Sequence, residues 1–179
     1  MPTPDAPAQP QTLYDFEATT ISGEPLRLAD FRGQVVIVVN VASTCGFTPQ
    51  YRGLEAIYRL YRDDGLAVLG FPCDQFGSQE SGDEATIATF CQTSYDVSFP
   101  MFSKVKVNGP EAHPLFTWLE DEERGILGSR SIKWNFTKFL VGRDGMVRER
   151  FASRTTPEAL VASRAFRAAL EAPRAEHLR

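Results

Sequence analysis

The sequence has few of the residues that build a metal centre or a disulfide-rich scaffold. Its 179 residues include only three cysteines and two histidines. These residues do not form the C-x-x-C or H-x-x-x-H spacings of structural zinc sites, so a zinc centre is disfavoured. The lack of a C-x-x-C pair also argues against a dithiol oxidoreductase. We therefore expect the cysteines to be reduced thiols rather than a disulfide framework.

Long hydrophobic runs and a strong charge imbalance are also missing. The longest aliphatic run, residues 35–39, is far shorter than the ~20 residues that span a membrane. The 19 basic and 23 acidic residues give a net charge of −4, which argues against a nucleic-acid or anionic-membrane binder. Residues 1–11 are rich in proline and lack an apolar signal segment. They predict a disordered lead and a cytoplasmic location.

The rest of the chain predicts one domain over residues 12–172, followed by a frayed tail at 173–179. The chain is long enough for a substantial core. Roughly alternating apolar residues begin at Leu13 and resume after a turn at 22–24. This alternation predicts an N-terminal β-hairpin.

A β-α-β unit follows the predicted hairpin. Residues 35–42 are almost wholly apolar and β-branched, as in a strand covered on both faces, and residues 66–71 form a second such strand. Between them, apolar residues recur at helical spacing. Thr48 is a candidate cap for this helix and Pro49 suits its first position.

The second half of the chain supplies further helices and a second hairpin. The Gly-Arg-Asp-Gly turn at 142–145 is a strong hairpin signal. A β-α-β half followed by a β-β-α half predicts an α/β protein with a thioredoxin-like fold, an N-terminal β-hairpin and a helical insertion. The helices are expected at 83–94, 113–122 and from 156 onward, and the strands at 139–141 and 146–151.

Cys45 lies between a predicted strand end and a predicted helix start. The unpaired amides and the helix dipole there favour a thiolate, which makes a reactive thiol about as well supported as a buried inert one. A cysteine hydrolase would need a histidine base, but His113 precedes a helix-starting proline and His177 lies in the tail. A peroxide is an electrophile that a thiolate attacks without a histidine.

Three segments resemble a known family. They are NVASTCGFTPQY at 40–51, GFPCDQFGSQE at 70–80 and IKWNFTKFLVGRDG at 132–145. In this order they resemble the glutathione peroxidases, and the resemblance runs from about Leu13 to Leu160. It implies a thioredoxin-like fold, reduction of hydrogen peroxide and organic hydroperoxides, and no cofactor.

The resemblance also implies which residues carry the chemistry. Cys45 occupies the peroxidatic position, and Gln79, Trp134 and Asn135 match the rest of the family's catalytic tetrad. The two amides and the indole N–H are neutral donors that can stabilise a thiolate and peroxide oxygens without acting as competing acids. Taken alone, Trp134 would fit a core position and Gln79 a solvated loop.

A second thiol must resolve the sulfenic acid formed at Cys45. By resemblance this thiol is Cys91, although a core-facing helical cysteine is the alternative. Cys73 is interpreted as structural. The sequence departs from the family pattern at Asp74, where asparagine is usual, and at Ser81, where proline often follows; neither position belongs to the tetrad.

The resemblance further implies the partners. The cysteine-type branch is recycled by thioredoxin, and glutathione remains an alternative donor. A thioredoxin-like module that exchanges disulfides with a partner, without peroxidase activity, is a third hypothesis. The segment 124–132 is shorter than the oligomerisation loop of tetrameric family members, which predicts a monomer.

Overall fold

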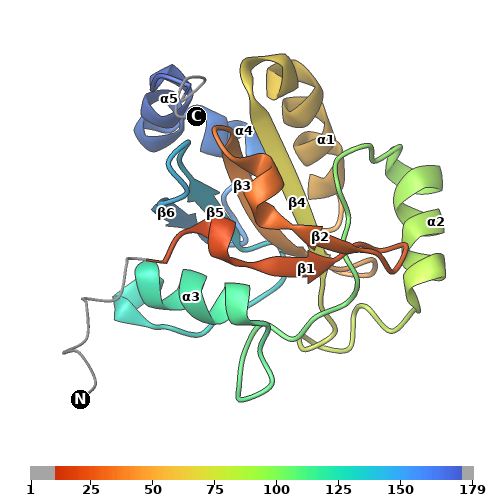
Figure 1. Ribbon diagram of the computed structural model, residues 1–179. Coiled ribbons are helices and arrows are strands. Elements are labelled where there is room, and N and C mark those ends of the chain that lie inside the picture. Colours follow the sequence, from red (N-terminus) through yellow and green to blue (C-terminus); the bar gives the residue numbers. More distant parts are fainter. Residues whose placement is uncertain (1–10, 175–179) are drawn as a thin grey trace, which may run out of the picture.

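A four-stranded sheet forms the centre of the protein (Figure 1), seen in a computed structural model that describes residues 11–174. The parallel pair and two antiparallel pairs give the strand order β4-β3-β5-β6. The predicted β-α-β and β-β-α halves therefore share one sheet. Its strands are β3 (Val35–Val41), β4 (Leu66–Pro72), β5 (Lys138–Val141) and β6 (Val147–Phe151).

Helices cover both faces of this sheet. Successive residues of β3 face opposite sides, so Val36 and Val38 enter one core cluster and Val35 and Ile37 the other. This explains why the whole strand is apolar. On one side lie α1 (Gln50–Tyr61), α2 (Glu84–Tyr95), α4 (Pro157–Val161) and α5 (Arg164–Glu171), and on the other α3 (Pro114–Glu122) with the hairpin β1 (Glu17–Thr19) and β2 (Pro25–Arg27).

The N-terminal hairpin is confirmed, but it is shorter than the alternation suggested. Residues Leu13–Asp15 form the 3-10 turn η1 instead of strand. The Thr12 side chain accepts from the Tyr14 amide, and the Asp15 carboxylate accepts from the Thr12 amide. This local capping competes with strand pairing, so β1 starts only at Glu17.

The expected final helix is wrong as a single element. A helix does begin at the predicted place, and Thr156 caps it as α4, because its side chain accepts from the Ala159 amide. Ser163 then accepts from the Phe166 amide and starts α5 as a separate helix. A serine that caps a new helix interrupts the old one, although Leu160 and Phe166 both enter the same core.

The ends of the chain are described only in part. The predicted disordered lead, apart from Gln11, lies outside the described residues, as do residues 175–179 of the predicted tail. Arg174, at the start of that tail, donates to the Asp63 carbonyl at 2.9 Å. Within residues 11–174, no helix is both long and apolar enough to cross a membrane.

Candidate active site

Cys45 lies in the tight loop between β3 and α1. Its side chain is buried, with 7% of the residue exposed. The Phe47 amide donates to the Cys45 Sγ at 3.3 Å, and the Cys45 carbonyl accepts from the Thr48 amide at 3.0 Å. The loop therefore directs a backbone donor at the sulfur, which stabilises negative charge on it.

Thr48 does not cap the following helix, so that prediction is wrong. Its hydroxyl accepts from the Cys45 amide at 2.8 Å and donates to the Ala42 carbonyl at 2.9 Å. The helix α1 begins at Gln50, after Pro49, without a side-chain cap. Thr48 instead closes the loop on itself and fixes the backbone that carries the thiol.

Gln79 and Asn135 are brought together from distant segments. The Asn135 Nδ2 donates to the Gln79 Oε1 at 2.9 Å. The amide and hydroxyl of Thr44, the residue before Cys45, both donate to the Gln79 carbonyl, at 3.2 and 2.9 Å. Two of the residues predicted from the resemblance thus form one polar pair, which is tied to the loop of the third.

Trp134 covers the same region. Its ring packs against Phe76, with ring centroids 5.8 Å apart, and lies over Gly77. Both neighbours belong to the loop that carries Gln79. Trp134 is 36% exposed, so the side chain remains partly open to solvent.

Asn40 in β3 fixes the turn that presents Trp134 and Asn135. Its Nδ2 donates to the Trp134 carbonyl at 3.2 Å, and its Oδ1 accepts from the Thr137 amide at 3.2 Å. Phe136, between them, has a φ of +61°, which a bulky residue adopts only when its surroundings enforce it. The sequence did not single out Asn40, because a polar residue at a strand end has no distinctive spacing.

Cys91 lies on the inward face of α2, in the core cluster that this helix shares with α1. It is 2% exposed, and its carbonyl accepts the Val97 amide where the helix ends. Burial raises the pKa of its thiol to about 11. All three cysteines are free thiols. Cys73 is also buried, and burial raises its pKa too.

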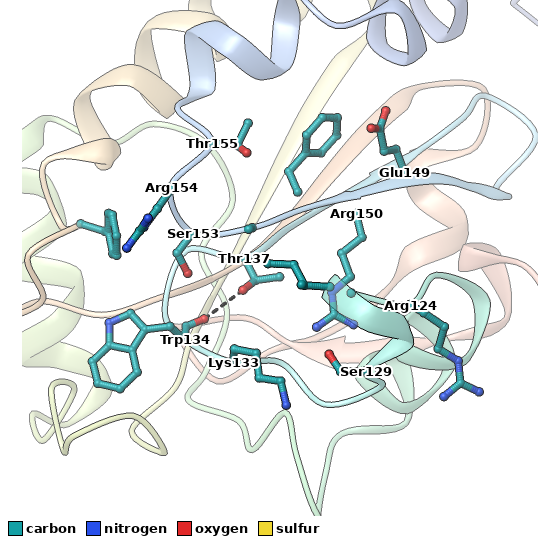
Figure 2. A pocket seen from close by; sticks show the side chains of 15 residues that line it. Arg124, Ser129, Lys133, Trp134, Thr137, Glu149, Arg150, Ser153, Arg154 and Thr155 are labelled. Carbon is teal, nitrogen blue, oxygen red and sulfur yellow. Dashed lines mark hydrogen bonds between the residues drawn. The ribbon is translucent and has the colours of Figure 1, made fainter.

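A cavity of about 530 Å³ lies beside Trp134 (Figure 2). Arg150 is held by the carbonyls of Arg130 and Ser131, at 2.8 and 2.9 Å, so it closes one wall. The basic residues that line this cavity come from three separate segments, so the sequence does not show that they lie together. The described lining includes the basic residues Arg124, Lys133, Arg150 and Arg154, the aromatic residues Phe47, Trp134 and Phe151, and the acidic residue Glu149.

Glu80 is a further residue of the site that sequence reasoning missed. Its side chain is buried, with 1% of the residue exposed, although a glutamate in a polar loop suggests a solvated side chain. Its Oε1 accepts from the Ser43 amide at 3.1 Å and from the Ser43 hydroxyl. Burial raises the pKa of this carboxyl. Across residues 11–174, no group of three or more side chains suited to metal binding is found.

The comparisons with known proteins identify the family. A family model described as glutathione peroxidase matches residues 13–120. The glutathione peroxidase of Lactococcus lactis subsp. cremoris (strain MG1363) is 57% identical over 146 residues, which cover 82% of this chain and 92% of that relative. This chain belongs to the glutathione peroxidase family.

Two other relatives of this glutathione peroxidase family member have informative names. A hydroperoxy fatty acid reductase of Synechocystis sp. (strain ATCC 27184 / PCC 6803 / Kazusa) is 51% identical and covers 84% of this chain and 92% of its own. A glutathione peroxidase-like peroxiredoxin of Saccharomyces cerevisiae (strain ATCC 204508 / S288c) is 51% identical and covers 83% of this chain and 91% of its own. The resemblance read from the sequence is thereby confirmed.

Solved structures confirm the fold of this family member. The crystal structure of Trgpx in its apo form is 40% identical, with a TM-score of 0.77, and covers 92% of this chain and 99% of its own. A thioredoxin-family thiol:disulfide interchange protein from Chlorobium tepidum TLS is 16% identical, with a TM-score of 0.66, and covers the same two shares. The fold is thioredoxin-like, as predicted.

The substitution Asn135→Ala tests the polar pair. It removes the donor to the Gln79 Oε1. We expect the rate constant for peroxide reduction to fall by about 100-fold, the usual cost of losing a fixed donor at a reacting oxygen. Stopped-flow measurement of the first peroxide equivalent checks this. Asn108→Ala is a control, since the Asn108 side chain forms its hydrogen bonds with the backbone carbonyl and amide of Ile132. An unchanged rate in Asn135→Ala would contradict a role for the Gln79–Asn135 pair.

Proposed function

We propose that this member of the glutathione peroxidase family reduces hydrogen peroxide and organic hydroperoxides through Cys45, with Cys91 as the resolving thiol and thioredoxin as the electron donor. The Cys45 thiolate attacks the peroxide O–O bond, and the indole of Trp134 and the amides of Gln79 and Asn135 stabilise the thiolate and the peroxide oxygens. An S–O bond forms as the O–O bond breaks, so Cys45 becomes a sulfenic acid and the other peroxide oxygen leaves as water or an alcohol.

One observation carries this proposal. The Asn135 Nδ2 donates to the Gln79 Oε1 at 2.9 Å, although 56 positions separate the two residues. The Gln79 carbonyl in turn accepts from Thr44, beside Cys45. Hydrogen bonds through Gln79 thus join three segments that only a resemblance linked in the sequence, which supports a common role for them beside Cys45. A thiol-exchange module has no need of this neutral donor pair.

The cycle needs two further thiol steps. Cys91 attacks the Cys45 sulfenic acid and forms a disulfide with loss of water, and a reduced dithiol protein then returns both thiols. Because disulfide-bonded Cα atoms lie within about 7 Å and Cys91 is buried in α2, we propose that this helix unwinds locally during the step.

Glutathione is a second candidate donor, favoured by the cavity beside Trp134. Its described lining includes Arg124, Lys133 and Arg154, whose charges suit the carboxylates of a small anionic thiol. Loss of one of these charges, as in Arg154→Ala, would then raise the KM for glutathione and leave the reaction of Cys45 with peroxide unchanged.

Turnover with a single donor distinguishes the two donors. We expect kcat/KM for thioredoxin, measured at micromolar donor, to exceed kcat/KM for glutathione, measured at millimolar donor, by at least about 10-fold. The reason is that a dithiol reduces a protein disulfide without a second donor molecule. The measurement uses the wild-type protein with each donor alone. If glutathione supported turnover and thioredoxin did not, glutathione would be the donor.

We also propose a monomer in the cytoplasm. The segment 124–132 is a short turn that contains only the 3-10 element η4 (Ile126–Gly128), which leaves little surface for assembly. A monomer would keep Trp134 accessible to a protein donor. The donor must itself be kept reduced, which a reducing compartment provides. Sedimentation of the full chain at several concentrations tests the monomer.

A further inference from the structure

Polar side chains of α1 hold the segment that follows α2, the helix that carries Cys91. Within α2, whose residues the structure describes in full, only Ile87 and Cys91 are buried. Helices with few buried apolar contacts open locally at a low free energy. The contacts just beyond the end of α2 therefore have a large influence on how often Cys91 is released.

Glu55 makes the central contact between α1 and this segment. Its carboxylate is buried, with 5% of the residue exposed, and its two oxygens accept from the Ser98 amide at 2.7 and 3.1 Å. The Ser98 hydroxyl donates to the same two oxygens. Hydrogen bonds to an ionised acceptor are about twice as strong as those between neutral groups. Ser98 is thereby fixed to α1.

Arg59 holds a second residue of the segment. Its Nη2 donates to the carbonyl and to the carboxylate of Asp96, both at 3.1 Å, and its Nε lies 3.5 Å from the Glu55 Oε2. Residues four apart lie on one face of a helix, so both side chains reach the same segment. Asp96 has a φ of +51°, an uncommon conformation for a residue other than glycine. Arg59 therefore holds a backbone turn that Asp96 does not strongly favour by itself.

The held segment is bonded to Cys91 itself. The Val97 amide, between the two held residues, donates to the Cys91 carbonyl at 3.2 Å. While its neighbours on both sides are fixed to α1, this bond keeps the last turn of α2 closed around Cys91. Cys91 is 2% exposed in this closed helix, so α2 must open before the thiol can attack Cys45.

We propose that Glu55 and Arg59, with the residues 96–98 that they hold, form a latch on α2, and that the opening of this latch sets the rate at which Cys91 resolves the Cys45 sulfenic acid. This inference rests on the proposed function, in which Cys91 is the resolving thiol. In that step an S–S bond forms and the S–O bond of the sulfenic acid breaks. The hydroxide leaves with the thiol proton as water.

The latch predicts an unusual direction of change. When opening reaches equilibrium before the thiol attacks, the rate of the step is proportional to the fraction of molecules that are open. Weakening the latch raises this fraction, so the resolving step becomes faster. Loss of a residue that only supports the structure around Cys45 would slow the step instead.

Two variants weaken the latch without removing apolar packing. Glu55→Gln keeps an acceptor for Ser98 but loses its charge, and we expect disulfide formation after one equivalent of hydrogen peroxide to become about 5-fold faster. Arg59→Gln changes a side chain that is 48% exposed, so the fold should be retained. We expect it to speed the step by about 3-fold. Rapid quenching with a thiol-alkylating reagent, followed by mass spectrometry, measures both rates.

Hydrogen exchange of the reduced proteins supplies the second readout. The amides across 84–98 should exchange faster in each latch variant, by the same factor as its disulfide formation, because both rates depend on the open fraction. The burst in which the first equivalent of peroxide is consumed should keep its wild-type rate, since it needs no opening of α2.

Glu120→Gln and Arg148→Gln are the matched controls. Glu120 in α3 is also 5% exposed and accepts from the Ile132 amide at 3.2 Å. The Arg148 side chain is 45% exposed and pairs with Asp144 four residues away, as Arg59 does with Glu55. Both residues lie outside α1 and α2, so exchange across α2 and disulfide formation should stay at their wild-type rates.

Three outcomes would overturn the inference. The first is unchanged exchange across 84–98 in both latch variants, which would mean that the latch does not hold α2. The second is faster exchange without faster disulfide formation, which would mean that opening does not limit the step. The third is the same acceleration in the controls. Failure of the proposed function looks different, because the wild-type protein would then form no Cys45–Cys91 disulfide at all.

Discussion

Replacing Cys45 with serine is expected to abolish peroxide reduction, with a loss of at least about 1,000-fold in kcat/KM. A hydroxyl is a far weaker nucleophile than a thiolate, and neither His113 nor another base lies in the Cys45 loop to activate it. The serine fits the same small site, where the Phe47 amide donates to the side-chain atom and the Thr48 hydroxyl accepts from the backbone amide of residue 45. The fold should therefore be unchanged.

Peroxide consumption with thioredoxin or glutathione as the donor measures this loss, and circular dichroism checks the fold. Cys73→Ser is the matched control, since Cys73 is buried and lies outside the Gln79–Asn135 pair. Full activity in Cys45→Ser would remove the basis of the proposed function. An equal loss in both variants would point to a general defect of the core.

The sequence predicts those parts of the fold in which the residue pattern is compatible with a single local structure. The fully apolar residues 35–42 allow only a strand buried on both faces, and the turn at 142–145 fixes a hairpin. Local capping was harder to predict. Thr12 and Ser163 each accept from a nearby amide, and in doing so they delay the start of the hairpin and split the last helix. These choices depend on competing bonds of similar strength.

The site could be predicted only through the resemblance. Residue type alone favoured a core position for Trp134 and a solvated one for Gln79, and their actual places depend on contacts between distant loops. The burial of Glu80 was hidden for the same reason, because its partner Ser43 comes from another segment. Short-range patterns report which face of an element is apolar, but not which loops meet.

Replacing Cys91 with serine is expected to separate the two halves of the cycle. The first equivalent of peroxide should be reduced at the wild-type rate, because Cys91 lies in α2, outside the pair of Gln79 and Asn135. Steady-state turnover with thioredoxin should fall by at least about 100-fold, since no thiol in the chain then attacks the sulfenic acid. A sulfenic acid on Cys45 should accumulate, and a dicarbonyl probe followed by mass spectrometry detects it.

The same variant tests the mobility of α2. The Cys91 carbonyl accepts from the amide of Val97, and the Ser98 amide binds Glu55, so the helix end must loosen before Cys91 can leave its site. In the wild-type protein, oxidation by one equivalent of peroxide should therefore speed hydrogen exchange of the amides across 84–95. In Cys91→Ser the exchange should stay at the level of the reduced protein.

Cys73→Ser decides between the two candidate resolving thiols. Cys73 is fully buried, and its Sγ lies 3.6 Å from the Oε1 of Gln75, an atom that also accepts from the amides of Val107 and Asn108. A thiol in this position supports a loop rather than a redox step, so thioredoxin-supported cycling should persist. If Cys91→Ser cycled normally and Cys73→Ser did not, Cys73 would be the resolving thiol, and the burial of Cys91 in α2 would serve packing alone.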